Sequence, residues 1–270
     1  MSAVGRFGVR RFSVKRSCEL AADCGLINCK LIMKKHIPNI LTLMNLFAGC
    51  MAILHLLNGE WRLVPVFALI GLIGDAADGI VARTLGVHSP LGKELDSLAD
   101  MVTFGVLPGA ILYHLLATAY TGTFDYEGVV WAAIPGFIIT MFSALRLAKF
   151  NIDERQTSDF IGLATPANTG FFVGLYLIVH FDTLIPGDWV LNLPLLYILG
   201  LVFSYFLISE IRMFGLKFNH WGWRGNELPY IFLITCVLLI VFLRLGAFSI
   251  GILTYLSIVL LDNVFLKKTK

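Results

Sequence analysis

The sequence predicts an all-α protein, a polytopic bundle of about eight transmembrane helices. Hydrophobic residues make up 57% of the 270 residues, charged residues make up only 14%, and the mean hydropathy is +0.80. Ordinary soluble domains have about 25% charged residues, so this composition excludes a soluble globular domain. From residue 33 onward, the apolar segments are close to the roughly 20 residues that a helix needs to cross a bilayer.

Residues 1–32 differ from the remainder and are expected to lie outside the fold. They carry Arg6, Arg10, Arg11, Lys15 and Arg16 but no apolar run long enough for a membrane span or a signal-peptide core. We therefore expect a disordered N-terminal extension, or one produced by an upstream start codon, followed by one membrane domain over 33–270. An Arg-rich, acid-poor opening would also suit a mitochondrial transit peptide, whereas the Met-Lys-Lys-His at 33–36 is typical of a bacterial start.

The apolar runs after this extension give the expected spans. They are 37–57, 63–83, 95–119, 129–149, 166–185, 190–209, 228–243 and 246–266, of which the seventh is marginal in length.

The distribution of basic residues predicts the orientation of the spans. Lys and Arg gather at alternate ends, in particular Lys34, Lys35, Arg83, Lys93, Arg146, Lys149, Arg155, Arg212, Lys217, Arg224, Lys267, Lys268 and Lys270. The opposite loops, such as 121–128 and 181–188, contain acidic residues and almost no basic ones, although Arg62 and Arg244 are exceptions. By the positive-inside rule, both termini and the loop between the second and third spans face the cytoplasm.

A cluster of acidic residues interrupts this apolar sequence between the second and third spans. It follows the pattern D-x2-D-G-x2-A-R-x8-G-x3-D-x3-D, formed by Asp75, Asp78, Gly79, Ala82, Arg83, Gly92, Asp96 and Asp100. A carboxylate at the centre of a membrane helix costs about 2.5–3.5 kcal/mol on insertion scales, so the cluster calls for compensating cations.

The spacing of the aspartates indicates how they act together. On helices, Asp75 and Asp78 share one face, as do Asp96 and Asp100. The segment 84–92 contains Gly and Pro and cannot continue a helix, so we expect two neighbouring helices joined by a short polar loop. Carboxylates suit Mg²⁺, Mn²⁺ or Ca²⁺, and a pair of such ions would hold a phosphate or pyrophosphate.

The remaining positions of the pattern suit phosphate binding. Gly79 and Ala82 leave the helix surface bare beside the acids, and Arg83 offers a forked, permanently charged donor to phosphate oxygens. The alternative interpretation is a solvated acidic face or an ion-pair network.

This pattern resembles the signature of the CDP-alcohol phosphatidyltransferase family, integral membrane enzymes that join a CDP-linked group to an acceptor alcohol and release CMP. The resemblance implies two divalent ions, Mg²⁺ or Mn²⁺, on the cytoplasmic side. Asp75, Asp78 and Asp96 would be metal ligands, and Asp100 would be both a ligand and the general base. It also implies that Gly79, Arg83 and Ser89 bind the CDP group, that six helices form the core with two added, and that the protein is a homodimer.

Three further stretches resemble the phosphatidylserine synthase branch of this family. They are 38–42 with Asn39 at the opening of the first span, 142–151 with Arg146 and Lys149, and 160–170, where Ala164 replaces a common Pro. The branch implies transfer of the phosphatidyl group from CDP-diacylglycerol to the hydroxyl of L-serine. Arg146 and Lys149, one helical turn apart and expected near water, could bind a phosphate or the serine carboxylate, or could be topology signals only.

Two alternatives remain open at this point. The acceptor could be glycerol 3-phosphate, inositol phosphate or another alcohol. From a different class, buried aspartates could belong to a divalent-cation transporter, although Arg83 would then repel the transported ion. We expect an integral protein of the bacterial inner membrane with its active site facing the cytoplasm, membrane lipid as its surroundings and no nucleic-acid partner.

Overall fold

The computed structural model describes residues 14–87, 89–152, 160–181, 186–213, 235, 239 and 247–266. Its elements are nearly all helical, which confirms the predicted helical membrane bundle. Within these described residues, four segments are long and apolar enough to cross a membrane, namely His36–Leu57, Leu63–Leu85, Pro90–Thr121 and Trp131–Ile152. The seventh predicted span, 228–243, lies almost wholly outside the described residues.

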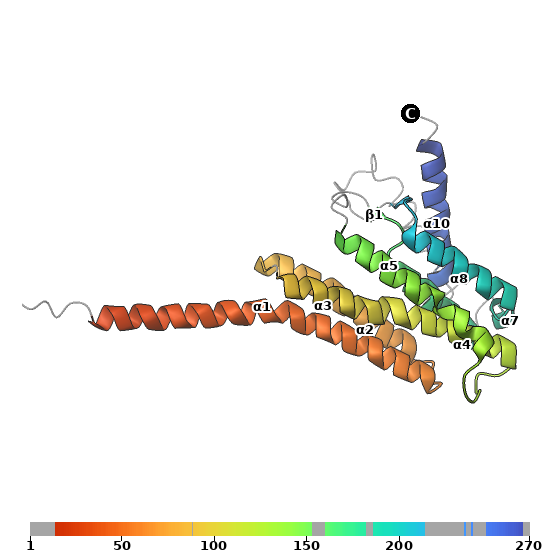
Figure 1. Cartoon of the computed structure of the whole chain (residues 1–270), viewed down its shortest axis with the longest axis horizontal. Helices are drawn as coiled ribbons and strands as arrows, with labels where there is room; N and C mark the ends of the chain where they lie inside the picture. The colour runs from red at the N-terminus through yellow and green to blue at the C-terminus, as the bar shows by residue number, and fades with distance from the viewer. Residues whose placement is uncertain are drawn as a thin grey trace, which may run out of the picture.

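The elements follow the predicted spans closely (Figure 1). They are α1 (Val14–Leu57), α2 (Leu63–Leu85), α3 (Pro90–Asp100), η1 (Met101–Val106), α4 (Leu107–Thr121), η2 (Trp131–Phe137), α5 (Ile138–Ile152), α6 (Thr165–His180), α7 (Gly187–Val190), α8 (Leu193–Ile208) and α10 (Ala247–Leu266). Two-residue strands, β1 (Phe160–Ile161) and β2 (Arg212–Met213), pair antiparallel beside the bundle.

Helix α1 begins earlier than the sequence predicted. It is helical from Val14, so residues 14–32 form a helix where we expected disorder, and Figure 1 shows this part projecting from the bundle. Pro38 lies inside α1, which corrects the expectation that it opens the first helix. Pro removes one backbone donor from a helix interior, and the Pro38 carbonyl oxygen lies 3.1 Å from Thr42 Oγ1. The domain boundary at residue 33 stays a prediction.

The core of the bundle is centred on α4. Its side chains from Leu107 to Thr118 are almost all buried, and it packs against α6, α8, η2 and the membrane part of α1. An aromatic stack between Phe171 of α6 and Phe203 of α8, with ring centroids 4.0 Å apart, extends this core. Large apolar side chains such as Phe47 and Ile73 remain exposed on α1 and α2, as expected for helices whose outer faces meet lipid hydrocarbon.

A π-helical turn, η1, joins α3 to α4 directly after Asp100. The neighbouring helices hold this wide turn through hydroxyl groups: Thr140 donates to the Gly105 carbonyl at 2.9 Å, and Thr169 donates to the Phe104 carbonyl at 3.1 Å. Thr103 in turn donates to the Asn45 carbonyl of α1 at 3.1 Å. Single π-turns inside α-helices often occur at functional sites, and this one fixes the chain beside the last motif aspartate.

Candidate active site

The reversal between α2 and α3 brings the motif residues together. Gly86 ends α2 in the left-handed conformation (φ 63°), where its N–H bonds the last carbonyls of the helix. Ser89 caps α3 by accepting the Gly92 N–H at 2.9 Å, and Pro90 occupies the first turn. The loop is therefore shorter than the predicted 84–92, and α3 begins five residues before the predicted span at 95.

Three of the predicted metal ligands converge. One carboxylate oxygen from each of Asp75, Asp78 and Asp96 lies within 4.8 Å of the others, so two residues of α2 face one of α3. Asp96 Oδ1 is buried and has no hydrogen-bond partner among the described residues. Buried acceptors are nearly always paired, and three adjacent carboxylates repel one another. The group therefore has the donor atoms and the unsatisfied oxygen that a hard divalent cation requires.

Two residues of helix α1 donate hydrogen bonds to two of the aspartates. Thr42 Oγ1 donates to Asp78 Oδ2 at 2.5 Å, and both side chains are buried. One turn later, Asn45 Nδ2 donates to Asp100 Oδ1 at 3.2 Å. Asp100 lies outside the group of three converging carboxylates, and its Oδ1 accepts the Asn45 amide.

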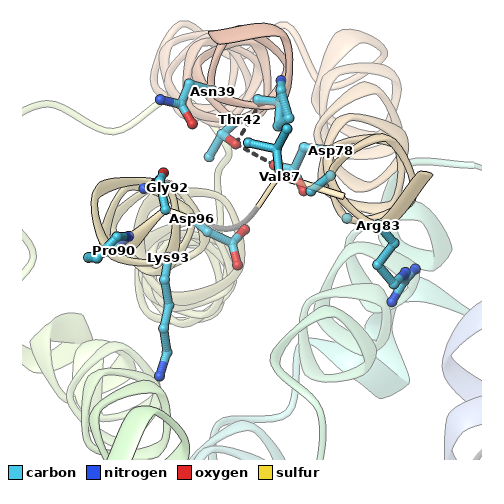
Figure 2. A pocket seen from close by; sticks show the side chains of 13 residues that line it. Asn39, Thr42, Asp78, Arg83, Val87, Pro90, Gly92, Lys93 and Asp96 are labelled. Atoms are coloured by element: carbon cyan, nitrogen blue, oxygen red, sulfur yellow. Dashed lines mark hydrogen bonds between the residues drawn. The ribbon is translucent and has the colours of Figure 1, made fainter. Parts of the chain in front are cut away.

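A cavity of about 620 Å³ opens beside the acidic cluster between α1, α2 and α3 (Figure 2). It is lined by Pro38, Asn39, Thr42, Asp78, Gly79, Ala82, Arg83, Val87, Ser89, Pro90, Gly92, Lys93 and Asp96. The structure thus brings the predicted binding residues Asn39, Gly79, Arg83 and Ser89 to one cavity. Figure 2 shows Arg83 and Lys93 extending from α2 and α3, away from α1.

The two motif glycines of this cavity serve different purposes. A Cβ atom at Gly79 would meet only Arg83 Nη2, at 3.9 Å, so no protein atom requires glycine there and the bare backbone faces the cavity. A Cβ atom at Gly92 would lie 2.9 Å from Ser89 Oγ and 3.2 Å from Asn39 Oδ1. Gly92 therefore allows two polar side chains to approach the start of α3.

Arg146 and Lys149 lie apart from this cavity. Both line a second, small cavity between α5, β1 and the end of α8. Arg146 is only 9% exposed, so the expectation that it lies near water is wrong; its Nη1 contacts Thr165 Oγ1 at 3.5 Å. Lys149 is 46% exposed and pairs with Glu210 at 3.6 Å.

Arg146 and Asp100 attract each other electrostatically, although no ion pair joins them among the described residues. The Nε atom of Arg146 has no hydrogen-bond partner in the described part of the chain. Ser143, one turn earlier on α5, and Asn168 on α6 are fully buried with side-chain polar atoms that also lack partners there. Arg146 and Ser143 on α5, and Asn168 on α6, are thus buried polar residues with unsatisfied atoms among the described residues.

Comparison with known proteins decides the family. The family model for CDP-alcohol phosphatidyltransferases matches residues 35–206, which includes every motif residue described above. The chain belongs to the CDP-alcohol phosphatidyltransferase family.

Several curated relatives carry one name, CDP-diacylglycerol–serine O-phosphatidyltransferase. The Bacillus subtilis protein is 32% identical over 193 residues, covering 71% of this chain and 94% of that protein. The Helicobacter pylori (strain J99) protein is 33% identical over 234 residues, covering 85% and 91%. The Methanocaldococcus jannaschii protein is 36% identical over 178 residues, covering 65% and 72%.

Sequence reasoning missed four polar residues around the site of this phosphatidyltransferase. Thr42 and Asn45 stand three residues apart in an apolar span, which is a signal for a shared face in contact with other polar groups. Ser143 and Asn168 have no such signal, because isolated Ser and Asn are common in membrane helices and only the packing of α5 and α6 shows that they are buried without partners.

Proposed function

We propose that this protein transfers the phosphatidyl group from CDP-diacylglycerol to the hydroxyl of L-serine, giving phosphatidylserine and CMP. The observation that carries the proposal is the acidic group of Asp75, Asp78 and Asp96 at the edge of a cavity that also presents Arg83. The relatives named above support serine as the acceptor.

The cavity suits the CDP part of the donor. Its volume of about 620 Å³ lies in the range of small-molecule sites, about 300–1,000 Å³. The bare surface at Gly79 admits a bulky group close to the backbone, Arg83 and Lys93 offer positive charge to phosphate oxygens, and Asn39 and Ser89 offer polar contacts. The acyl chains would then extend between helices into the bilayer.

The acidic group suits two divalent cations, Mg²⁺ or Mn²⁺, bound by Asp75, Asp78, Asp96 and Asp100. Such ions, when bound, neutralise charge that develops on the departing phosphate. The unsatisfied Asp96 Oδ1 and the mutual repulsion of the converging carboxylates support this assignment.

Asp100 is the proposed general base. It takes the proton of the serine hydroxyl while the serine oxygen forms a bond to the phosphorus that bears diacylglycerol. The bond between that phosphorus and the bridging oxygen breaks, and CMP leaves with the electron pair. The hydrogen bond from Asn45 distinguishes Asp100 from the three converging carboxylates.

Arg146 is the proposed ligand of the serine carboxylate. It is buried, retains an unpaired Nε among the described residues and interacts with the base Asp100. Lys149 is less suited to bind the serine carboxylate, because it already forms an exposed ion pair with Glu210. The unpaired Ser143 and Asn168 would complete a polar acceptor region.

The membrane setting follows the charge distribution. The described residues include four segments able to span a membrane, and we place the protein in the bacterial inner membrane with both termini and the α2–α3 loop in the cytoplasm. Accessible tags at the C-terminus and at Gly122 would test this, because they should report opposite sides. A homodimer remains part of the proposal and rests on the resemblance alone; cross-linking in the membrane would test it.

An acceptor screen tests the function directly. Purified protein in lipid discs would receive labelled CDP-diacylglycerol, Mn²⁺ or Mg²⁺, and one of L-serine, glycerol 3-phosphate or inositol phosphate, with CMP release as the readout. We expect CMP release with serine only. Release with another acceptor would contradict the assignment of serine. No release with any acceptor, together with metal flux into proteoliposomes in the absence of nucleotide, would favour a cation transporter.

A further inference from the structure

Asn45 is a fully buried amide in the apolar segment of α1, at 0% exposure. Its Nδ2 donates to Asp100 Oδ1 at 3.2 Å, and its backbone carbonyl accepts the Thr103 hydroxyl at 3.1 Å. It does not line the cavity beside the acidic cluster, and an amide nitrogen that donates to a carboxylate is not a metal ligand. Among the described residues, Asp100 is the motif aspartate to which the Asn45 side chain donates.

The amide has little freedom to move. A Cβ atom at Gly71 of α2 would lie 3.1 Å from Asn45 Oδ1, and one at Gly74 would lie 3.3 Å from Asn45 Cβ, so α2 packs directly against this side chain. The Thr103 hydrogen bond fixes the Asn45 backbone to η1, the turn that directly follows Asp100. The donor Asn45 on α1 and the acceptor Asp100 at the end of α3 thus belong to helices that the Thr103 hydrogen bond holds together.

We propose that Asn45 is a positioning residue for the transfer reaction, which holds the Asp100 carboxylate in the orientation needed to take the proton of the acceptor hydroxyl. The inference rests on the proposed function, because it requires Asp100 to act as the base. By donating to Oδ1, the amide opposes rotation of the carboxylate about its terminal bond and so fixes which oxygen faces the acceptor hydroxyl.

Thr42 makes a similar hydrogen bond to a second motif aspartate. One turn earlier on the same helix, it donates to Asp78 of α2, while Asn45 donates to Asp100 of α3. Helix α1 therefore fixes the position of Asp78, a member of the acidic group, relative to the base Asp100. General-base catalysis depends on such geometry, and a displacement of about 1 Å can cost about 100-fold in rate.

Asn45→Leu is the test, because Leu has a similar shape but no donor. Asn45 Oδ1 has no partner within the described residues, so the substitution removes a single side-chain hydrogen bond. We expect kcat with serine to fall roughly 10- to 100-fold. The KM for CDP-diacylglycerol, the Kd for a CDP-lipid measured by calorimetry with Mn²⁺, and the Mn²⁺ concentration for half-maximal activity should each stay within about 3-fold.

Thr103→Val is the matched control. It removes the hydrogen bond from Thr103 to the Asn45 backbone carbonyl but keeps the hydrogen bond from the Asn45 side chain to Asp100. A purely structural role for the α1–η1 contact predicts that both variants lower the unfolding temperature and change kcat alike. The positioning role predicts that kcat falls much more in Asn45→Leu than in Thr103→Val.

Two results would overturn the proposal, and a variant that fails to fold is replaced by a milder one. A folded Asn45→Leu protein with kcat within 3-fold of the parent would overturn the proposal, as would a loss of CDP-lipid binding in proportion to the loss of kcat. If Asn45→Leu does not fold, Asn45→Ser is measured in the same way, and its hydroxyl donor should give a kcat between those of the parent and Asn45→Ala. If the parent releases CMP only with an acceptor other than serine, the proposed function fails, and the same comparison runs with that acceptor.

Discussion

Lys93 of α3 donates from Nζ to the backbone carbonyl of Asn151, the last but one residue of α5, at 3.0 Å. The Asn151 side chain returns the contact, because its Nδ2 donates to Ser97 Oγ on the next turn of α3 at 2.8 Å. The motif helix that bears Asp96 and Asp100 is thereby attached to the helix that bears Arg146. This attachment gives a physical role to Asn151, the last residue of the 142–151 stretch.

Removing that side-chain contact should loosen the docking of α3 on α5. Asn151→Ala is expected to lower the free energy of unfolding by about 1 kcal/mol, the usual value of one hydrogen bond. Ser97→Ala removes the same bond, so the double variant should be no less stable than the worse single variant. Thermal unfolding in detergent measures all three. Additive losses would mean that the two side chains do not depend on each other.

The aspartates should separate into ligands and base on substitution by Asn. Asp100→Asn is expected to reduce turnover with serine by about 100-fold or more while much of the Mn²⁺-dependent binding of CDP-lipid persists. Asp75→Asn should lose turnover and binding together, because a missing ligand charge weakens the ions. Calorimetry across a Mn²⁺ series distinguishes the two, and a chelator should abolish activity in every variant. Equal loss of lipid binding in both would remove the distinct role of Asp100.

Arg146 and Lys149 should differ sharply in their effect on the acceptor. Arg146→Gln is expected to raise the KM for serine at least about 10-fold, because a buried charged hydrogen bond to a carboxylate is worth about 1.5–3 kcal/mol. Lys149→Gln removes an exposed ion pair with Glu210, so the KM should change less than about 3-fold. Initial rates against serine concentration provide the measurement. A larger effect at Lys149 would reverse the assignment of the carboxylate ligand.

The two motif glycines provide a test of the cavity. Gly79→Ala adds a methyl group that the protein can accommodate but that enters the cavity, so the KM for CDP-diacylglycerol should rise while the unfolding temperature is unchanged. Gly92→Ala places a methyl group 2.9 Å from Ser89 Oγ, so the cap of α3 must shift and the unfolding temperature should fall. If Gly79→Ala instead destabilised the protein with an unchanged KM, the donor would not approach this backbone.

Much of the fold follows from the sequence because a bilayer imposes simple rules. Apolar length located α2 to within two residues of its end, and Asp, Gly and Arg spacing identified residues that do line one cavity. The π-turn, the burial of Arg146 and the interior position of Pro38 were not predictable. Each depends on which neighbouring helix supplies a partner, such as Thr140 and Thr169 for the carbonyls of η1, and a single sequence does not specify those partners.

The helix that carries the last two aspartates continues without a break into the buried centre of the protein, through the wide turn Met101–Val106. The backbone bonds of this turn span one residue more than those of an α-helix, so the turn accommodates an extra residue. Changing the number of residues in it would alter either the width of the turn or the face that Asp96 and Asp100 present relative to α4, although every side chain of the site would still be present. The number of residues between Asp100 and the core is therefore a determinant of activity in its own right, and alignments that gain or lose a residue there should mark proteins with a differently oriented acidic group.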